Sequence, residues 1–202
     1  MTRWKTTDLD SAALFQRKRD AVIHEAAQAF SRFGYHGTSL DDIARVLNVT
    51  KAALYYYVAS KQELLAHCHA IGLGICEASL ADGRAKATSG LDAIDGFVRA
   101  YVDRATGELG VCLLIGDLSC LAPAARTEVM ARRDAFEGSL RDLIRAGRED
   151  GGIRPDVDPK LSCFQILGAL NHIPRWYSPT GPNSPAELAQ YFARQIHASL
   201  SI

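Results

Sequence analysis

The segment from Thr38 to Leu65, TSLDDIARVLNVTKAALYYYVASKQELL, limits the possible fold more than any other part of the chain. Its apolar residues recur at three- and four-residue spacings, which is typical of helices with one buried face. Thr38 or Ser39 can cap a first helix, because each is followed three residues later by an aspartate. Asn48-Val49-Thr50 then forms a turn, since asparagine tolerates a left-handed backbone. The segment predicts two short helices around a tight turn, followed by a third.

The second helix of this pair is predicted over Lys51–Tyr57, with Thr50 as its cap and with Leu54 and Val58 facing inward. Its outer face combines small residues, a lysine and large aromatic residues. This is a poor face for solvent but suits a DNA groove, where hydroxyl and ammonium groups meet phosphates and base edges. We therefore expect DNA binding by Thr38, Thr50, Lys51, Ala52, Tyr55, Tyr56, Tyr57, Lys61 and Arg17.

A supporting helix is predicted upstream, over Arg17–Gly34, with one apolar stripe and Gly34 as its C-cap. Together, these segments closely resemble the N-terminal domain of TetR-family transcriptional regulators. Tyr57-Val58 departs from the His-Phe that the family usually carries, and Ala52 stands where glycine is frequent. The agreement rests on Phe30, Gly34-Tyr35, Thr38-Ser39, Ile43-Ala44, Val49-Thr50, Leu54-Tyr55, Ser60-Lys61 and Leu64-Leu65.

The charge distribution has the sign expected of a DNA-binding head. The whole chain has a net charge of zero, but residues 1–61 hold nine basic and six acidic residues, a net charge of +3. This is modest for a DNA-binding domain. DNA binding would therefore depend on a dimer that presents two DNA-binding domains. It would also depend on the local positive charge at Arg17–Arg19 and in an N-terminal arm over Arg3–Lys5. The charges of the arm also fit a solvated, disordered tail.

The composition is that of a soluble regulator. Its 202 residues allow one core or two small ones, and 48% of them are apolar. No uninterrupted apolar run reaches the roughly 18 residues of a membrane span, and no secretion signal stands at the N-terminus. Five widely spaced cysteines without a Cys-x-x-Cys motif indicate a reduced, cytoplasmic setting.

The rest of the chain predicts helices only, so the expected fold is all-α with about nine helices. We expect a DNA-binding domain over residues 1–62 and a helical ligand-binding and dimerisation domain over 63–202. The expected segments are a helix from Ser60 to Leu80, a polar loop over Asp82–Gly90, a helix over Leu91–Val102, a short segment over Val111–Leu121, and helices opened by Pro123, Pro159 and Ser184-Pro185.

The segment Pro159–Pro174 is predicted as one helix that is apolar on more than one side. Such a helix needs two burial partners. One face can line the domain core. The other can meet the last helix and the same pair from a second copy, which predicts a homodimer with a four-helix interface on a pseudo-palindromic DNA operator.

Two polar residues, Arg133 and Asn171, stand on stripes predicted to face the core. Such an arginine must pair with an acid such as Asp117, extend to water, or meet an anionic ligand. The run from Asn171 through Arg175-Trp176-Tyr177 to Ser184-Pro185 resembles the end of FadR-type TetR regulators of fatty-acid and steroid catabolism, and that resemblance implies an acyl-CoA effector. Trp176 and Tyr177 also fit a purely structural plug. The expected ligand-binding residues are Phe97, Tyr101, Arg133, Phe136, Phe164, Asn171, Arg175 and Trp176.

Other functions find less support in the sequence. His67 and His69 would point about 200° apart on a helix, so they do not form a metal clamp. Ser119-Cys120 lacks a nucleophile elbow, and no phosphate-binding glycine loop is present, so neither an enzyme nor a cofactor is expected. The alternatives are a multidrug-type regulator with a cationic or aromatic effector, and a helical interaction protein without DNA binding. The expected mechanism is repression that an effector relieves by shifting the helix after Ser60, which both domains share.

Overall fold

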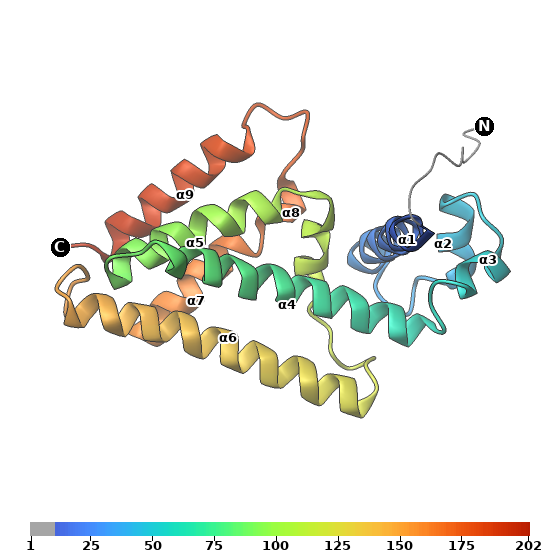
Figure 1. The fold of residues 1–202 in the computed structure, drawn as a ribbon, viewed down its shortest axis with the longest axis horizontal. Coiled ribbons are helices and arrows are strands. Elements are labelled where there is room, and N and C mark those ends of the chain that lie inside the picture. Colours follow the sequence, from blue (N-terminus) through green and yellow to red (C-terminus); the bar gives the residue numbers. More distant parts are fainter. Residues whose placement is uncertain (1–10) are drawn as a thin grey trace. The chain divides into compact units, whose positions relative to one another are not determined.

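The computed structural model describes residues 11–202, so the Arg3–Lys5 arm lies outside the described residues. The described chain is helical, and the expected all-α fold is confirmed (Figure 1). It divides into two compact units, the first ending at Cys68 and the second covering residues 69–202. The elements are α1 (Ser11–Phe33), α2 (Leu40–Val46), α3 (Lys51–Tyr55), α4 (Lys61–Ala85), α5 (Gly90–Ala105), the 3-10 helix η1 (Glu108–Leu114), α6 (Pro123–Glu149), α7 (Pro159–Leu170), α8 (Ile173–Trp176) and α9 (Pro185–Leu200).

The first unit packs α1, α2, α3 and the first turns of α4 around a small core. Gly34 ends α1 with a φ of +75°, and Asn48 takes the left-handed conformation in the turn with a φ of 54°. Ser39, rather than Thr38, caps α2, and it forms a capping box with Asp42. The unit extends past the expected boundary at residue 62 because α4 completes its core through Leu64, Leu65 and Cys68, each no more than 1% exposed.

Several helix ends differ from the sequence expectation, and α1 begins at Ser11 rather than at Arg17. α3 ends at Tyr55 instead of Tyr57, because Ser60 begins a new cap in which its hydroxyl accepts the Glu63 amide at 3.0 Å. α4 continues to Ala85, through the start of the expected loop. A Cβ on Gly83 would lie 2.5 Å from the Ala93 carbonyl oxygen, so only glycine lets α4 approach α5 this closely.

The expected helix Pro159–Pro174 is wrong, because it is two helices. α7 ends at Leu170, where the Asn171 amide donates to the Leu167 carbonyl at 2.9 Å. Pro174 has no amide hydrogen for the Leu170 carbonyl, so the regular helix stops and the four-residue α8 follows in a new direction. The expected segment Val111–Leu121 is also shifted, since the 3-10 helix η1 occupies Glu108–Leu114.

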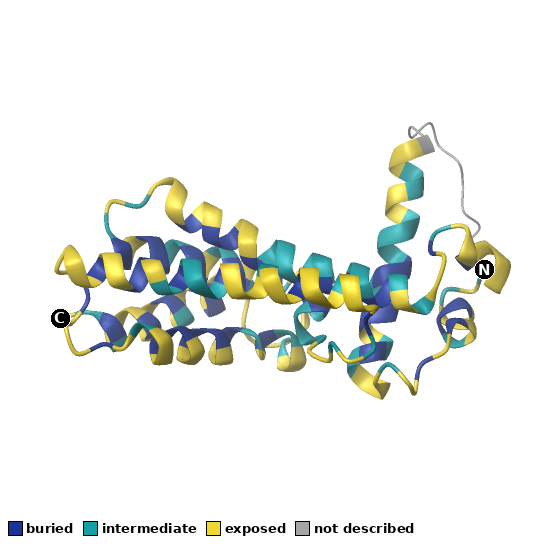
Figure 2. Ribbon diagram, turned by 90° about the horizontal axis from the view of Figure 1, so that it is seen from below, coloured by how far each residue is buried: buried dark blue, intermediate teal, exposed yellow. Residues whose placement is uncertain are grey.

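The core of the second unit is built around α5. Phe97, Val98, Tyr101 and Val102 have no exposed surface, and α5 contacts α6, α7, α8, α9 and η1. Most helices of this unit show one buried and one exposed side (Figure 2). The apolar surface removed from water around α5 is the main source of stability for the unit, at roughly 25 cal/mol per Å².

Candidate DNA-binding face and effector cavity

The exposed face of α3 carries the residues that the sequence assigned to DNA. Thr50 caps the helix by accepting the Ala53 amide at 3.1 Å. Leu54 is fully buried and anchors the helix, while Lys51 and Ala52 face solvent. Tyr55 is 47% exposed and Tyr56 is 73% exposed, so both phenol groups present much of their surface to solvent. The chemistry of this face is therefore that of a recognition helix.

Lys51 connects α3 to α2. Its Nζ atom lies 2.8 Å from Oδ2 of Asp41, and this hydrogen bond raises the pKa of Lys51. Both side chains are about half exposed, so the pair contributes little to folding stability. Its importance is positional, because it holds an ammonium group at the first residue of α3.

The tyrosines at the end of α3 pack against α1. The Phe15 ring centroid lies 5.6 Å from that of Tyr56 and 5.2 Å from that of Tyr57. Tyr57 is therefore only partly exposed, and it serves both as a candidate DNA contact and as packing for α1.

Two basic residues and one threonine complete the expected DNA set. Arg17 is exposed on α1, and Lys61 lies with its Nζ atom 4.1 Å from the centroid of the Tyr35 ring, a cation–π contact. Thr38 does not share this face: its side chain is 3% exposed and its hydroxyl donates to the Gly34 carbonyl at 3.0 Å. Thr38 closes the corner between α1 and α2, so the expectation that its hydroxyl faces DNA is corrected.

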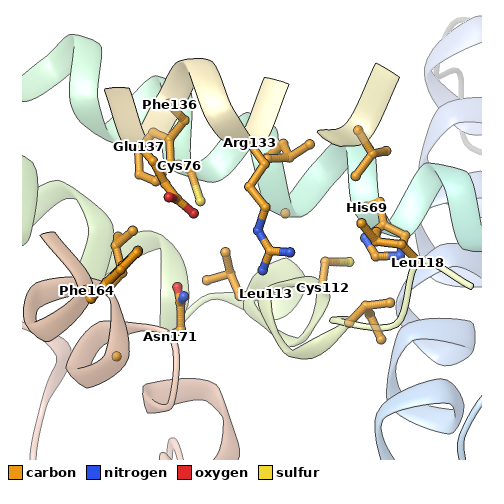
Figure 3. Close-up of a pocket in the computed structure, with 16 residues that line it drawn as sticks. His69, Cys76, Cys112, Leu113, Leu118, Arg133, Phe136, Glu137, Phe164 and Asn171 are labelled. Atoms are coloured by element: carbon orange, nitrogen blue, oxygen red, sulfur yellow. The ribbon is translucent and has the colours of Figure 1, made fainter. Parts of the chain in front are cut away.

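The second unit contains a cavity of about 260 Å³. Its walls come from α4, from η1 and the loop after it, from α6 and from α7 (Figure 3). Most of the lining residues are apolar, as is usual for a small-molecule site, and a few polar side chains stand among them. The apolar walls are formed by Leu73, Leu113, Ile115, Leu118, Val129, Phe136, Phe164 and Leu167.

Arg133 is the main charged group of the cavity. Its guanidinium extends from α6 toward η1, between the apolar walls (Figure 3). Glu137 lines the same cavity but is paired with Arg141, with 3.4 Å between the charged atoms. Asp117, the acid that the sequence offered as an internal partner, instead uses its carboxylate to accept the Ser119 amide at 2.8 Å. As a cation in the cavity lining, Arg133 can meet an anionic group of a ligand.

Asn171 supplies an oriented amide at the α7 wall. The buried Tyr101 hydroxyl donates a hydrogen bond to its Oδ1 atom. Burial raises the pKa of Tyr101, so the phenol stays protonated and keeps its role as donor. The amide nitrogen of Asn171 then remains to donate toward a ligand carbonyl.

His69 is an uncharged donor at the α4 wall. It is 6% exposed, and burial lowers its pKa below the usual 6.5, with a further contribution from the Arg133 charge. Its Nε2 atom lies 3.3 Å from the Asp117 carbonyl oxygen, which accepts only, so the proton sits on Nε2. Burial also raises the pKa of Cys76 to about 11, which keeps this cavity thiol neutral and unreactive at pH 7.

Comparison with known proteins decides the family. Residues 22–68 match the model of the bacterial regulatory proteins of the tetR family, and residues 87–200 match the tetracyclin repressor-like C-terminal domain. The HTH-type transcriptional regulator RutR of Escherichia coli K12 is 43% identical over 169 residues, which cover 83% of this chain and 78% of RutR. The chain belongs to the TetR family of transcriptional regulators.

Two solved structures share the fold. The ketosteroid regulator KstR2 of Mycobacterium tuberculosis superposes with a TM-score of 0.81 at 23% identity, covering 92% of this chain and 95% of KstR2. AibR, solved with isovaleryl coenzyme A and operator DNA, superposes with a TM-score of 0.72 at 24% identity, covering 88% of this chain and 97% of AibR. TetR regulators bind operator DNA as dimers, and a ligand-binding site is typical of the family.

The TetR fold places only part of the expected ligand set around the cavity. Arg133, Phe136, Phe164 and Asn171 line it. Phe97 and Tyr101 do not, because both are completely buried around α5, and Tyr101 meets the cavity wall through Asn171 and Cys76. Arg175 and Trp176 also lie outside its wall: Trp176 is 48% exposed on α8 and stacks on Phe192, with 6.4 Å between the ring centroids.

Sequence reasoning missed the contribution of α4 and η1 to the cavity. The sequence singled out His69 only to exclude a metal clamp with His67, but His69 lines the cavity with Cys76 and Cys112. A histidine in the middle of an apolar helix was the signal that was available.

Among the described helices, α4 is the one long and apolar enough to span a membrane. Its most apolar 18-residue window has a mean hydropathy of 1.4. That window is 50% buried in the protein, as in the core helix of a soluble protein, so it is weak evidence for a span.

Proposed function

We propose that this TetR regulator is a dimeric, cytoplasmic repressor that binds a pseudo-palindromic operator through α3. The observation that carries the proposal is the exposed face of Lys51, Ala52, Tyr55 and Tyr56 around the buried anchor Leu54. The ammonium and phenol groups suit phosphates and base edges, and the small Ala52 allows α3 to lie close to the groove floor. Two such heads compensate for the modest positive charge of each.

We propose that the effector binds in the cavity of the second unit and is an acyl thioester of coenzyme A with a short acyl group. At about 260 Å³ the cavity is smaller than the roughly 300–1,000 Å³ of sites for drug-sized ligands, so a long chain would not fit. The acyl group would lie against Leu113, Phe136 and Leu167. The thioester carbonyl would accept from the Asn171 amide, and the large anionic remainder would lie outside the cavity.

The charges of the site favour an anionic effector. Arg133 would meet a phosphate or carboxylate of the ligand, and the exposed Arg175 of α8 is the second cation proposed for this role. The C-terminal resemblance to FadR-type regulators and the acyl-CoA bound by AibR agree with this class of ligand. A cationic effector is disfavoured, since it would face Arg133 while Glu137 is engaged by Arg141.

Coupling between effector and operator would pass through α4. His69, Gly72, Leu73 and Cys76 of this helix line the cavity, while its first turns are part of the core of the first unit. A ligand that binds better to one position of α4 would change operator affinity by the same free-energy difference, typically about 1–3 kcal/mol.

The test is a titration of the protein bound to DNA from upstream of its own gene. Isovaleryl coenzyme A, isovalerate and a cationic dye are added separately, and release is followed by fluorescence anisotropy. We expect release by the thioester, and a weaker response in the Arg133→Ala variant. Release by the dye alone, or an unchanged thioester response in a variant carrying both Arg133→Ala and Arg175→Ala, would exclude the acyl-CoA proposal and leave the DNA-binding proposal standing.

A further inference from the structure

Arg19 of α1 is held by His67 of α4 within the first unit. Its Nη2 atom lies 2.6 Å from Nε2 of the His67 ring and 3.4 Å from Nδ1. A guanidinium only donates hydrogen bonds, so the ring nitrogen that meets it must be an acceptor. The shorter distance makes Nε2 this acceptor, and the neutral ring then carries its proton on Nδ1.

The same ring nitrogen faces a second partner of opposite charge. Nε2 of His67 lies 3.1 Å from Oε1 of Glu63, one turn earlier in α4. A carboxylate only accepts, so this contact needs a proton on Nε2. The two contacts therefore exclude each other: neutral His67 accepts from Arg19, whereas protonated His67 donates to Glu63 and repels the guanidinium. Among the described residues, Arg19 from α1 and Glu63 from α4 are the charged groups that contact the ring.

Glu63 is held in place as the acceptor for the protonated ring. Its Oε2 atom accepts the Ala59 amide at 2.6 Å. This hydrogen bond lowers the pKa of Glu63, and His67 and Arg19 add to the effect. The carboxylate is therefore ionised between pH 5 and 8, the range in which a histidine ordinarily changes its charge. A proton gained by His67 in this range finds an acceptor one helical turn away.

Arg19 stands near the edge of the DNA-binding face. It follows Phe15 by four residues, so the two side chains share one side of α1, about 6 Å apart. The Phe15 ring packs on Tyr56 and Tyr57 at the end of α3. Once it is released from His67, the long side chain of Arg19 can turn toward a phosphate beside these tyrosines.

We propose that Arg19 contacts a DNA phosphate, that neutral His67 holds it away from the DNA, and that protonation of His67 releases it. The state that binds DNA best is then the protonated one, so operator affinity rises as the pH falls. By linkage, DNA binding favours protonation of His67 to the same extent. The inference rests on the proposed function, because it adds a contact and its regulation to the same DNA-binding face.

The test uses three variants and a matched control. His67→Gln keeps a neutral acceptor for Arg19 at every pH, His67→Lys places a permanent cation beside it, and Arg19→Gln removes the released group. The control carries His24→Gln and His36→Gln, which change the other two histidines of the first unit. Fluorescence anisotropy on the DNA upstream of the gene, at pH 5.5 and pH 8, measures affinity and its salt dependence on either side of an ordinary histidine titration. Circular dichroism checks the fold.

For the wild type and the control we expect roughly tenfold tighter binding at the lower pH, the size of one additional exposed ion pair in each of two subunits. The log–log salt slope should also be steeper by about two at the lower pH, because each subunit gains one phosphate contact. Both His67→Gln and Arg19→Gln should lose this pH response. His67→Lys should bind at the higher pH as tightly as the wild type does at the lower one.

A second measurement needs no DNA. At the higher pH, the nitrogen chemical shifts of the His67 ring should report a proton on Nδ1, because the contact with Arg19 occupies Nε2 as an acceptor. Arg19→Gln should move the proton toward Nε2, where it can be donated to Glu63.

Two results would overturn the inference: a wild-type His67 ring that carries its proton on Nε2 at the higher pH, or a pH response that survives in the Arg19→Gln variant. Failure of the wild type to bind the DNA at either pH would instead count against the proposed operator contact. In that case the position of the ring proton still decides whether His67 holds Arg19.

Discussion

Lys51 of α3 and Asp41 of α2 form an ion pair across the helix-turn-helix, with 2.8 Å between Nζ and Oδ2. The ammonium group that we assign to a DNA phosphate is therefore already occupied by a carboxylate in the free protein. DNA must compete with Asp41 for Lys51, and the aspartate itself repels the phosphates. The pair places Lys51 correctly and at the same time limits the affinity of the DNA-binding face.

Asp41→Asn is expected to strengthen operator binding. The substitution removes one negative charge from each face and frees each Lys51 for a phosphate, so the dependence of log K on log salt should become steeper by about two for the dimer. Fluorescence anisotropy at several salt concentrations measures both quantities. Weaker binding by the variant would show that Asp41 is needed to orient Lys51 and would reject the competition argument.

Tyr55→Ala and Lys51→Ala are expected to weaken DNA binding without loss of helicity, because both side chains are exposed and Leu54 remains to anchor α3. For the wild-type dimer, roughly 6–10 neutralised phosphates give a log–log salt slope of about −5 to −9. A gel shift on the DNA upstream of the gene, with circular dichroism as the folding control, tests this. Unchanged binding by both variants would mean that α3 does not read DNA through this face.

Tyr101→Phe is expected to weaken effector binding although Tyr101 does not line the cavity. Its hydroxyl fixes the Asn171 amide, and its loss leaves that partly buried amide without its donor, at a cost of about 1–3 kcal/mol. Asn171→Ala should produce a similar loss, and the double variant little more, since the two residues act as one unit. Calorimetry with isovaleryl coenzyme A gives the comparison, and additive losses would contradict the coupling.

His69 predicts a pH dependence of stability. Because its pKa is lowered in the folded state, the unfolded chain binds the proton more readily. Its stabilising contribution is therefore complete above pH 6.5 and declines as the pH falls below that value. Urea unfolding of the wild type and of the His69→Gln variant between pH 7.5 and 5 is expected to show a shallower decline for the variant. Parallel curves would mean that His69 titrates normally in the folded chain.

The local features of the helix-turn-helix were determined by the sequence alone. Ser39, Asn48 and Thr50 form their caps and turn with residues no more than four positions away, so short-range spacing is sufficient to predict them. The two faces of α3 were also predictable, because the 3.6-residue period separates Leu54 from Tyr55. Thr38 was the exception, since the contact that buries its hydroxyl depends on how α1 ends.

The effector cavity was decided by tertiary structure. Arg133, Phe136, Phe164 and Asn171 were found by their stripes, but a stripe only predicts that a residue faces inward, and Arg133 and Phe164 are exposed in the structure. Phe97 and Tyr101 stand on an equally good stripe and lie in the solid core, while His69 on α4 reaches the cavity. Which of these residues line the cavity depends on the packing of α4, η1, α6 and α7. It also depends on the interruption of the helix between Leu170 and Ile173. These distances in space are not encoded in any local spacing, because they result from contacts between helices that are far apart in the sequence.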